Sequence, residues 1–74
     1  MAKHRTYSVD VRVTLIENKN YTLFRDKKII FIPKGLKTKD FNTYMFGSLY
    51  QMFSQVYDTG TFKFEILDYN RLSL

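Results

Sequence analysis

The sequence predicts an α+β fold in which one helix packs on one face of a four-stranded mixed sheet. Residues 41–57 carry no formal charge and place apolar side chains at helical spacing, which predicts the only helix. Residues 7–15 before the helix and residues 62–66 after it alternate apolar and polar side chains, as half-buried strands do. The expected order is therefore β-β-β-α-β, with an antiparallel meander of three strands before the helix and one strand after it.

The first three strands are expected between residues 7 and 32. Apolar residues occupy every second position from Tyr7 to Leu15, so one face of this strand should enter the core. The asparagines in residues 17–20 predict a turn, and residues 21–25 form the expected second strand. Asp26 and Lys27 are expected to make a tight connection to a third strand at residues 28–32.

The apolar run Ile29–Ile32 lacks alternation, which predicts that both of its faces are covered. The last strand is expected at residues 61–69, parallel to the first and third. If it lies beside the first strand, Asp10 and Arg12 would face Lys63 and Glu65. If it lies beside the third strand, the Ile29–Ile32 run becomes central. The sequence leaves both positions open.

The chain length of 74 residues indicates a single domain, and a domain of this size buries a thin core. Residues 1–5 are expected to form a flexible basic arm and residues 70–74 a frayed tail. There is no cysteine, so disulfides are excluded, and self-association as a homodimer remains a possible source of stability. No segment is apolar enough to span a membrane, so a cytoplasmic protein is expected, in the host cell if a phage encodes it.

The titratable residues do not suggest an active site. The only histidine, His4, lies in the expected arm, and the seven acidic residues are scattered along the chain. The three glycines stand alone, which excludes a glycine-rich phosphate loop. We therefore expect a protein that is not an enzyme and that holds neither a metal nor a cofactor.

Two sides of the predicted helix are candidates for binding a partner. Its apolar arc covers about half of the circumference, more than a core-facing stripe needs, so one aromatic flank should stay partly exposed. The opposite side carries small or neutral groups, which suit close approach by another chain. The expected partner-binding residues are Tyr44, Phe46, Gly47, Tyr50, Gln51, Ser54 and Tyr57. The alternative is that sheet side chains cover the flank and that the neutral side faces only water.

The positive charge is concentrated in residues 19–39, where seven cations stand against Asp26 alone and give a net charge of +6. The expected basic surface consists of Arg25, Lys27, Lys28, Lys34, Lys37 and Lys39. Aromatic residues lie among these cations, so the hairpin could bind nucleic acid through phosphate contacts and base stacking. The other interpretations are an acidic or nucleoprotein partner and a surface that only keeps the protein soluble.

These observations predict a small non-enzymatic protein that acts by protein–protein contact. In its size and its richness in Lys, Asn, Ile, Phe and Tyr, the chain resembles the small inhibitors and adaptors that phages and mobile elements encode. The resemblance implies a target in the host's nucleic-acid-handling machinery and assigns no role to any residue. The alternative function is direct nucleic-acid binding by the basic hairpin at residues 19–39.

Overall fold

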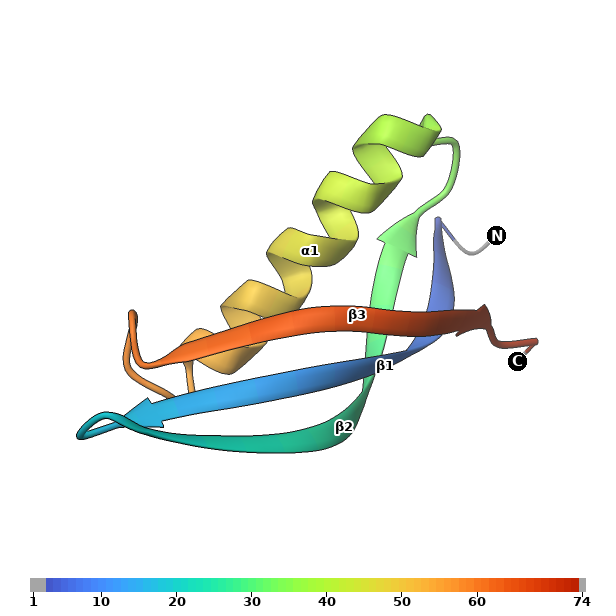
Figure 1. Cartoon of the computed structure of the whole chain (residues 1–74). Helices are drawn as coiled ribbons and strands as arrows, with labels where there is room; N and C mark the ends of the chain where they lie inside the picture. The colour runs from blue at the N-terminus through green and yellow to red at the C-terminus, as the bar shows by residue number, and fades with distance from the viewer. Residues whose placement is uncertain (1–2, 74) are drawn as a thin grey trace.

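The structure is a computed structural model that describes residues 3–73. Its elements are β1 (His4–Glu17), β2 (Asn20–Pro33), α1 (Thr38–Ser54) and β3 (Phe62–Arg71). The strands form one antiparallel sheet in the order β2-β1-β3, and α1 lies across one face of it (Figure 1). The long β1–β2 hairpin gives the molecule extents of 47 × 20 × 19 Å.

The turn predicted at residues 17–20 is confirmed as a two-residue hairpin loop. Glu17 pairs with Asn20, and the two residues between them, Asn18 and Lys19, have φ values of 46° and 69°. Left-handed backbone at both loop positions gives the turn a twist that matches the twist of the strands. Asparagine tolerates this conformation better than most residues.

The predicted four-stranded sheet is wrong, because Asp26 and Lys27 lie in the middle of one continuous strand. In β2, Asp26 pairs with Val11 and Lys27 pairs with Asp10 of β1. Each charge also has a partner: the Lys28 ammonium lies 3.3 Å from the Asp26 carboxylate, and the Lys27 ammonium lies 3.8 Å from Asp10. These contacts let a charged pair remain extended where the sequence suggested a turn.

The last strand is antiparallel to β1, and not parallel as expected, because the chain has one strand fewer before the helix. It lies beside β1, which makes β1 the central strand. Arg12 is opposite Glu65, as expected for that position, and its guanidinium lies 3.0 Å from the carboxylate. Asp10 does not face Lys63 or Glu65; its partner in β3 is Asp68.

The core lies between α1 and the inner face of the sheet. Its fully buried side chains are Val9, Val11, Val13, Ile30, Ile32, Met45, Leu49 and Phe53. The helix begins three residues before the predicted start and ends at Ser54. Val56, which the helical pattern placed on the core side, is therefore beyond the helix and 69% exposed.

The chain ends are more ordered than the sequence suggested within the part that the structure describes. His4 and Arg5, expected in an arm, are the first residues of β1. Asn70 and Arg71, expected in a tail, belong to β3, and the Leu72 amide donates a 2.9 Å hydrogen bond to the Thr6 carbonyl. The predicted arm also includes residues 1 and 2, and the predicted tail includes residue 74; these three lie outside the described residues.

Candidate functional site

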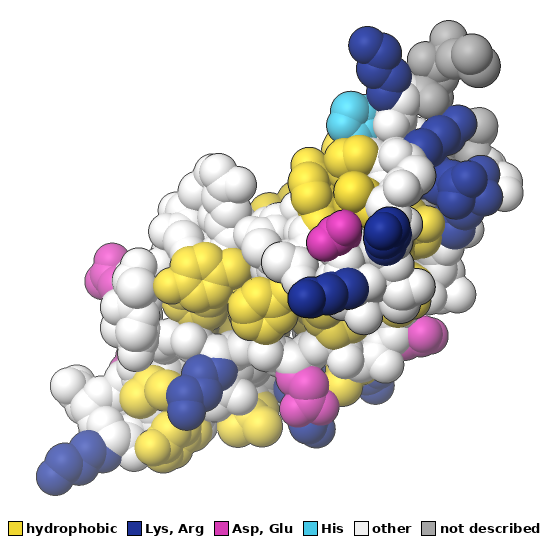
Figure 2. Space-filling model, turned by 90° about the horizontal axis from the view of Figure 1, so that it is seen from above, with side chains coloured by type: hydrophobic (Ala, Val, Ile, Leu, Met, Phe, Trp, Pro, Cys, Tyr) yellow, Lys and Arg dark blue, Asp and Glu magenta, His cyan; other side chains and the backbone are white. Residues whose placement is uncertain are grey.

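The aromatic flank of α1 lies against β3 and remains partly exposed. The Phe46 ring stacks on Phe64 with 4.7 Å between the ring centroids, and Tyr50 lies 5.6 Å from Phe62. Phe46 is nevertheless 51% exposed and Tyr50 is 42% exposed. With Lys63, these residues line a shallow groove of about 330 Å³ along the edge of β3. Figure 2, which views the molecule from above the view of Figure 1, shows hydrophobic side chains exposed on this side.

The other predicted partner-binding residues are spread around the helix. Tyr44, Gly47 and Gln51 are exposed, and the space that a side chain on Gly47 would occupy is open. Ser54 is half-buried, and its hydroxyl donates a 2.7 Å hydrogen bond to the Tyr50 carbonyl. Tyr57 is half-buried against Phe53, with ring centroids 6.4 Å apart. The structure thus brings Phe46 and Tyr50 together and places Tyr57 at the margin of the core.

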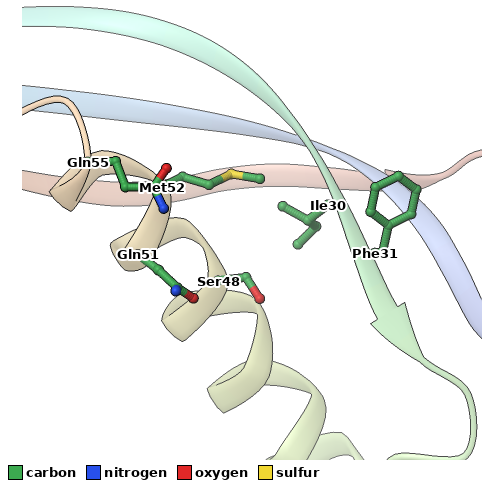
Figure 3. A pocket seen from close by; sticks show the side chains of 6 residues that line it. All are labelled: Ile30, Phe31, Ser48, Gln51, Met52 and Gln55. Carbon is green, nitrogen blue, oxygen red and sulfur yellow. The ribbon is translucent and has the colours of Figure 1, made fainter.

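A second groove separates α1 from β2 and has a volume of about 360 Å³ (Figure 3). On the strand side it is lined by Ile30 and Phe31, and on the helix side by Ser48, Gln51, Met52 and Gln55. Met52 points across the groove toward Ile30. Of the residues that the structure describes, no charged one lines this groove, so its polar contacts come from one hydroxyl and two amide side chains.

The outer face of the sheet, opposite α1, carries a row of exposed apolar residues on β2. The prediction that both faces of the Ile29–Ile32 run are covered is wrong, because β2 is an edge strand and no described element packs on its outer face. Ile30 and Ile32 are buried under α1, whereas Ile29 is 45% exposed and Phe31 is 61% exposed. Tyr21 and Leu23 are also exposed on this face, beyond Arg25 and Lys27. Outward and inward side chains alternate in the folded strand, but the residue types of β2 do not alternate between apolar and polar, so no sequence pattern signals this exposed face.

Two backbone hydrogen bonds of the neighbouring strand β1 show which amides and carbonyls of β2 point to the open edge of the sheet. The Ile16 amide donates to the Thr61 carbonyl at 2.8 Å, and the Thr6 carbonyl accepts from Leu72, so even-numbered residues of β1 bond toward β3. Odd-numbered residues of β1 must then bond toward β2, where their partners are even-numbered. The amides and carbonyls of Ile29 and Phe31 therefore point to the open edge of the sheet.

The predicted basic surface divides into two groups. Lys27 and Lys28 are ion-paired with Asp10 and Asp26, and the Lys28 ammonium lies 5.5 Å from the centre of the Phe53 ring. Arg25 lies on the outer face in the middle of β2, opposite Arg12. Lys34 and Lys37 lie between β2 and α1, and Lys39 lies in the first turn of α1. The structure therefore does not assemble one continuous basic hairpin.

A cationic end of the molecule, which we define as Lys3, Arg5, Lys34, Lys37, Lys39 and Arg71, joins three predicted basic-surface lysines to three cations that the sequence pattern did not place with them. The Lys34 amide donates a 3.1 Å hydrogen bond to the Lys3 carbonyl, and a hollow of about 350 Å³ is lined in part by Arg5, Lys34 and Arg71. None of the six is ion-paired with another described residue. Figure 2 shows Lys and Arg side chains gathered at this end, beside His. Pairing of the strand ends brings these sequence-distant cations together, so no local pattern reveals them.

Comparison with known proteins gives no information on the function of these surfaces. No protein-family model, curated protein or solved structure matches the chain. Within residues 3–73, no three His, Asp or Glu side chains are arranged to hold a metal ion. The helix of this region is too short and too polar to cross a membrane. The surfaces of the described residues that could bind a partner are the exposed apolar surfaces, the open edge of β2 and the cationic end.

Proposed function

We propose that the protein is a small non-enzymatic binding protein that acts by occupying a surface of a larger protein. The observation that supports this function is the amount of apolar surface left uncovered on so small a domain. The groove with Phe46 and Tyr50 and the β2 row with Ile29 and Phe31 lie on opposite sides of the sheet. Single exposed apolar residues are common on monomers, but grouped aromatic and aliphatic side chains mark contact surfaces.

The cationic end favours a target that carries negative charge beside an apolar contact surface. Six cations at one end of the molecule stand against Asp40 in the first turn of α1. Charge of one sign steers association with an oppositely charged surface and raises its rate. A nucleoprotein complex offers both kinds of surface, so we propose inhibition or adaptation of nucleic-acid-handling machinery in the host cytoplasm.

The test of this function replaces the exposed flank while leaving the core in place. Phe46→Glu combined with Tyr50→Lys should abolish capture of the partner from a lysate of the host cell and preserve the far-ultraviolet circular dichroism spectrum. Val56→Glu is the control, because it removes an exposed apolar side chain at a different place. Partner capture that survives the double substitution would contradict a role for this flank. If no protein is captured by the unmodified chain, the proposed function itself fails.

A second candidate function, direct nucleic-acid binding, is favoured by the cationic end alone. Its cations have no ion-pair partner among the described residues, so they are available to phosphates. Each phosphate contact contributes about 0.9 to the slope of log affinity against log salt on duplex DNA. Substituting Lys34, Lys37 and Lys39 by Gln should therefore lower that slope by about two to three units.

The matched control for nucleic-acid binding replaces Lys27 and Lys28 by Gln, since both already have a carboxylate partner. This pair should change the salt slope by less than about one unit, well below the roughly 1.8 units that two phosphate contacts would give. Fluorescence anisotropy of a labelled duplex at several salt concentrations measures both. Absence of any retention on nucleic acid at low salt would eliminate this candidate.

A further inference from the structure

From the open edge of β2, which adjoins the groove lined by Ile30 and Met52, we infer that the protein binds an extended acidic segment of its partner as an added fourth strand. This inference rests on the proposed protein-binding function and specifies where and how one partner segment attaches. Strand addition gains affinity from main-chain hydrogen bonds and specificity from side-chain pockets beside the edge. Both components are present along β2.

The hydrogen-bonding component consists of the outward-pointing amides and carbonyls of β2. The Lys27 amide is already bonded, because it donates to its neighbour Asp26 at 2.8 Å. Among the described residues, no side chain or loop backbone bonds the outward groups of Ile29 and Phe31. The edge is therefore blocked in the middle and open from Ile29 onward, next to the groove.

The pocket component is the groove between β2 and α1 (Figure 3). Residues directly opposite each other on paired strands place their side chains on the same face of the sheet. The residue that pairs opposite Ile30 would therefore enter the groove, where Met52 offers an apolar contact and Gln51 an amide. Its neighbours on the incoming strand would lie on the outer face, where they would cover Ile29 and Phe31.

The charges around this edge favour a segment with carboxylates at its ends. The two nearest acidic residues, Asp10 and Asp26, already form ion pairs with Lys27 and Lys28. Arg25 on one side and Lys34 on the other have no such partner among the described residues. An extended segment reaching from one to the other spans about nine residues at the rise of a β-strand. Only its part beside Ile29 and Phe31 pairs with the edge; the part that passes the bonded Lys27 amide toward Arg25 makes no strand hydrogen bond there.

A second copy of the chain fits this edge less well than an acidic segment. Two β2 strands placed side by side would bring two edges of the same charge together, since each carries Arg25 and Lys34 without an ion-pair partner among the described residues. Like charges across an interface oppose association. The phosphates of a nucleic acid would complement the positive charge of the edge, but a nucleic acid could not pair with the backbone amides as a strand. The charge and the open amides together therefore select an acidic polypeptide.

The test uses a synthetic peptide of about nine residues, the span given by the strand rise, with glutamates at both ends and alternating valine and threonine between them. Its matched control carries lysines in place of the glutamates. In the isotope-labelled full chain, the acidic peptide should slow amide hydrogen exchange at Ile29 and Phe31 at least about tenfold, the change expected when an open amide gains a strand partner. Lys28 and Ile30 should change little, because their amides already bond to β1.

Variants separate strand addition from simple charge attraction. Ile29→Pro removes one outward amide and leaves the bonds between β1 and β2 intact, so it should abolish protection of Phe31 by the peptide. Leu23→Pro is the matched control at the same kind of position away from the groove. If Ile29→Pro fails to fold, Gln51→Glu and Gln51→Lys replace it; they should weaken and strengthen peptide binding by about two- to fivefold, as exposed charges do.

Several results would overturn the inference. These are absence of protection at Ile29 and Phe31 at saturating peptide, equal binding of the lysine peptide, or protection produced by a DNA duplex and not by the peptide. Protection already present in the free chain, together with a concentration-dependent molecular size, would show that a second copy occupies the edge. If the peptide fails while a captured partner still depends on Phe46 and Tyr50, strand addition is wrong and the proposed function stands.

Discussion

The Lys27 amide donates a 2.8 Å hydrogen bond to the carboxylate of Asp26, the residue before it on the open edge of β2. The same carboxylate lies 3.3 Å from the Lys28 ammonium, which shares its face of the strand. A charged residue that points toward the helix side of an edge strand hinders pairing with another chain. Asp26 therefore blocks the middle of an edge whose end remains open.

Removing this carboxylate should extend the open part of the edge. In Asp26→Ala, the Lys27 amide loses its partner and Lys28 loses its ion pair, so we expect the acidic peptide to slow hydrogen exchange at Lys27 as well as at Ile29 and Phe31. Asp58→Ala, which removes an exposed carboxylate outside the sheet, should not show this added protection. Amide hydrogen exchange with and without the peptide compares the two variants. Absence of peptide-dependent protection at Lys27 in Asp26→Ala would mean that Asp26 does not block the edge.

The bond between Arg12 and Glu65 should contribute little to stability although its geometry is good. Its guanidinium nitrogen lies 3.0 Å from both carboxylate oxygens, yet the two side chains are 48% and 60% exposed. A double-mutant cycle with Arg12→Ala and Glu65→Ala should give a coupling free energy of about 0.2–1 kcal/mol that falls with added salt. A salt-independent coupling of about 3 kcal/mol or more, the range typical of buried pairs, would contradict this.

Core and surface positions of the helical pattern should respond very differently to truncation. Leu49 is fully buried, so Leu49→Ala should lower the free energy of unfolding by about 2–5 kcal/mol. Val56 lies beyond the helix and is 69% exposed, so Val56→Ala should change it by less than about 0.5 kcal/mol. Urea denaturation measures both. A large loss for Val56→Ala would show that the helix continues past Ser54.

Two glycines should respond oppositely to alanine. Gly47 lies within the helix, and a Cβ added there would meet no other atom. Because alanine has the higher helix propensity, Gly47→Ala should stabilise the protein by about 0.8–1 kcal/mol. Gly35 has φ +85°, where a side chain strains the backbone, so Gly35→Ala should destabilise it by about 1–2 kcal/mol. Thermal unfolding followed by circular dichroism compares them. A destabilising Gly47→Ala would indicate a close neighbour that the structure does not contain.

The sequence predicted the elements whose pattern is local and missed those that depend on pairing between strands. Strict alternation identified β1, and the uncharged apolar run identified α1 with its buried Met45 and Leu49. The sequence predicts two strands in place of β2 because aspartate is common in turns, and only the ion-pair partners of Asp26 and Lys27 in the folded state keep this segment extended.

For the candidate site, exposure of Phe46 and Tyr50 was predicted, because a half-apolar helix cannot be covered by so small a sheet. The cationic end was not predicted, because Arg5 and Arg71 lie near Lys34 only through the pairing of the strands.

The most direct test of β2 as one continuous strand with an open edge is amide hydrogen exchange of the free protein. We predict slow exchange at Asp26, Lys28 and Ile30, whose amides bond to β1, and fast exchange at Ile29 and Phe31. Fast exchange at Asp26 and Lys28 would mean that the chain turns there, and β2 would not be one strand. Slow exchange at Ile29 and Phe31 would mean that another strand already covers the edge, and β2 would have no open edge.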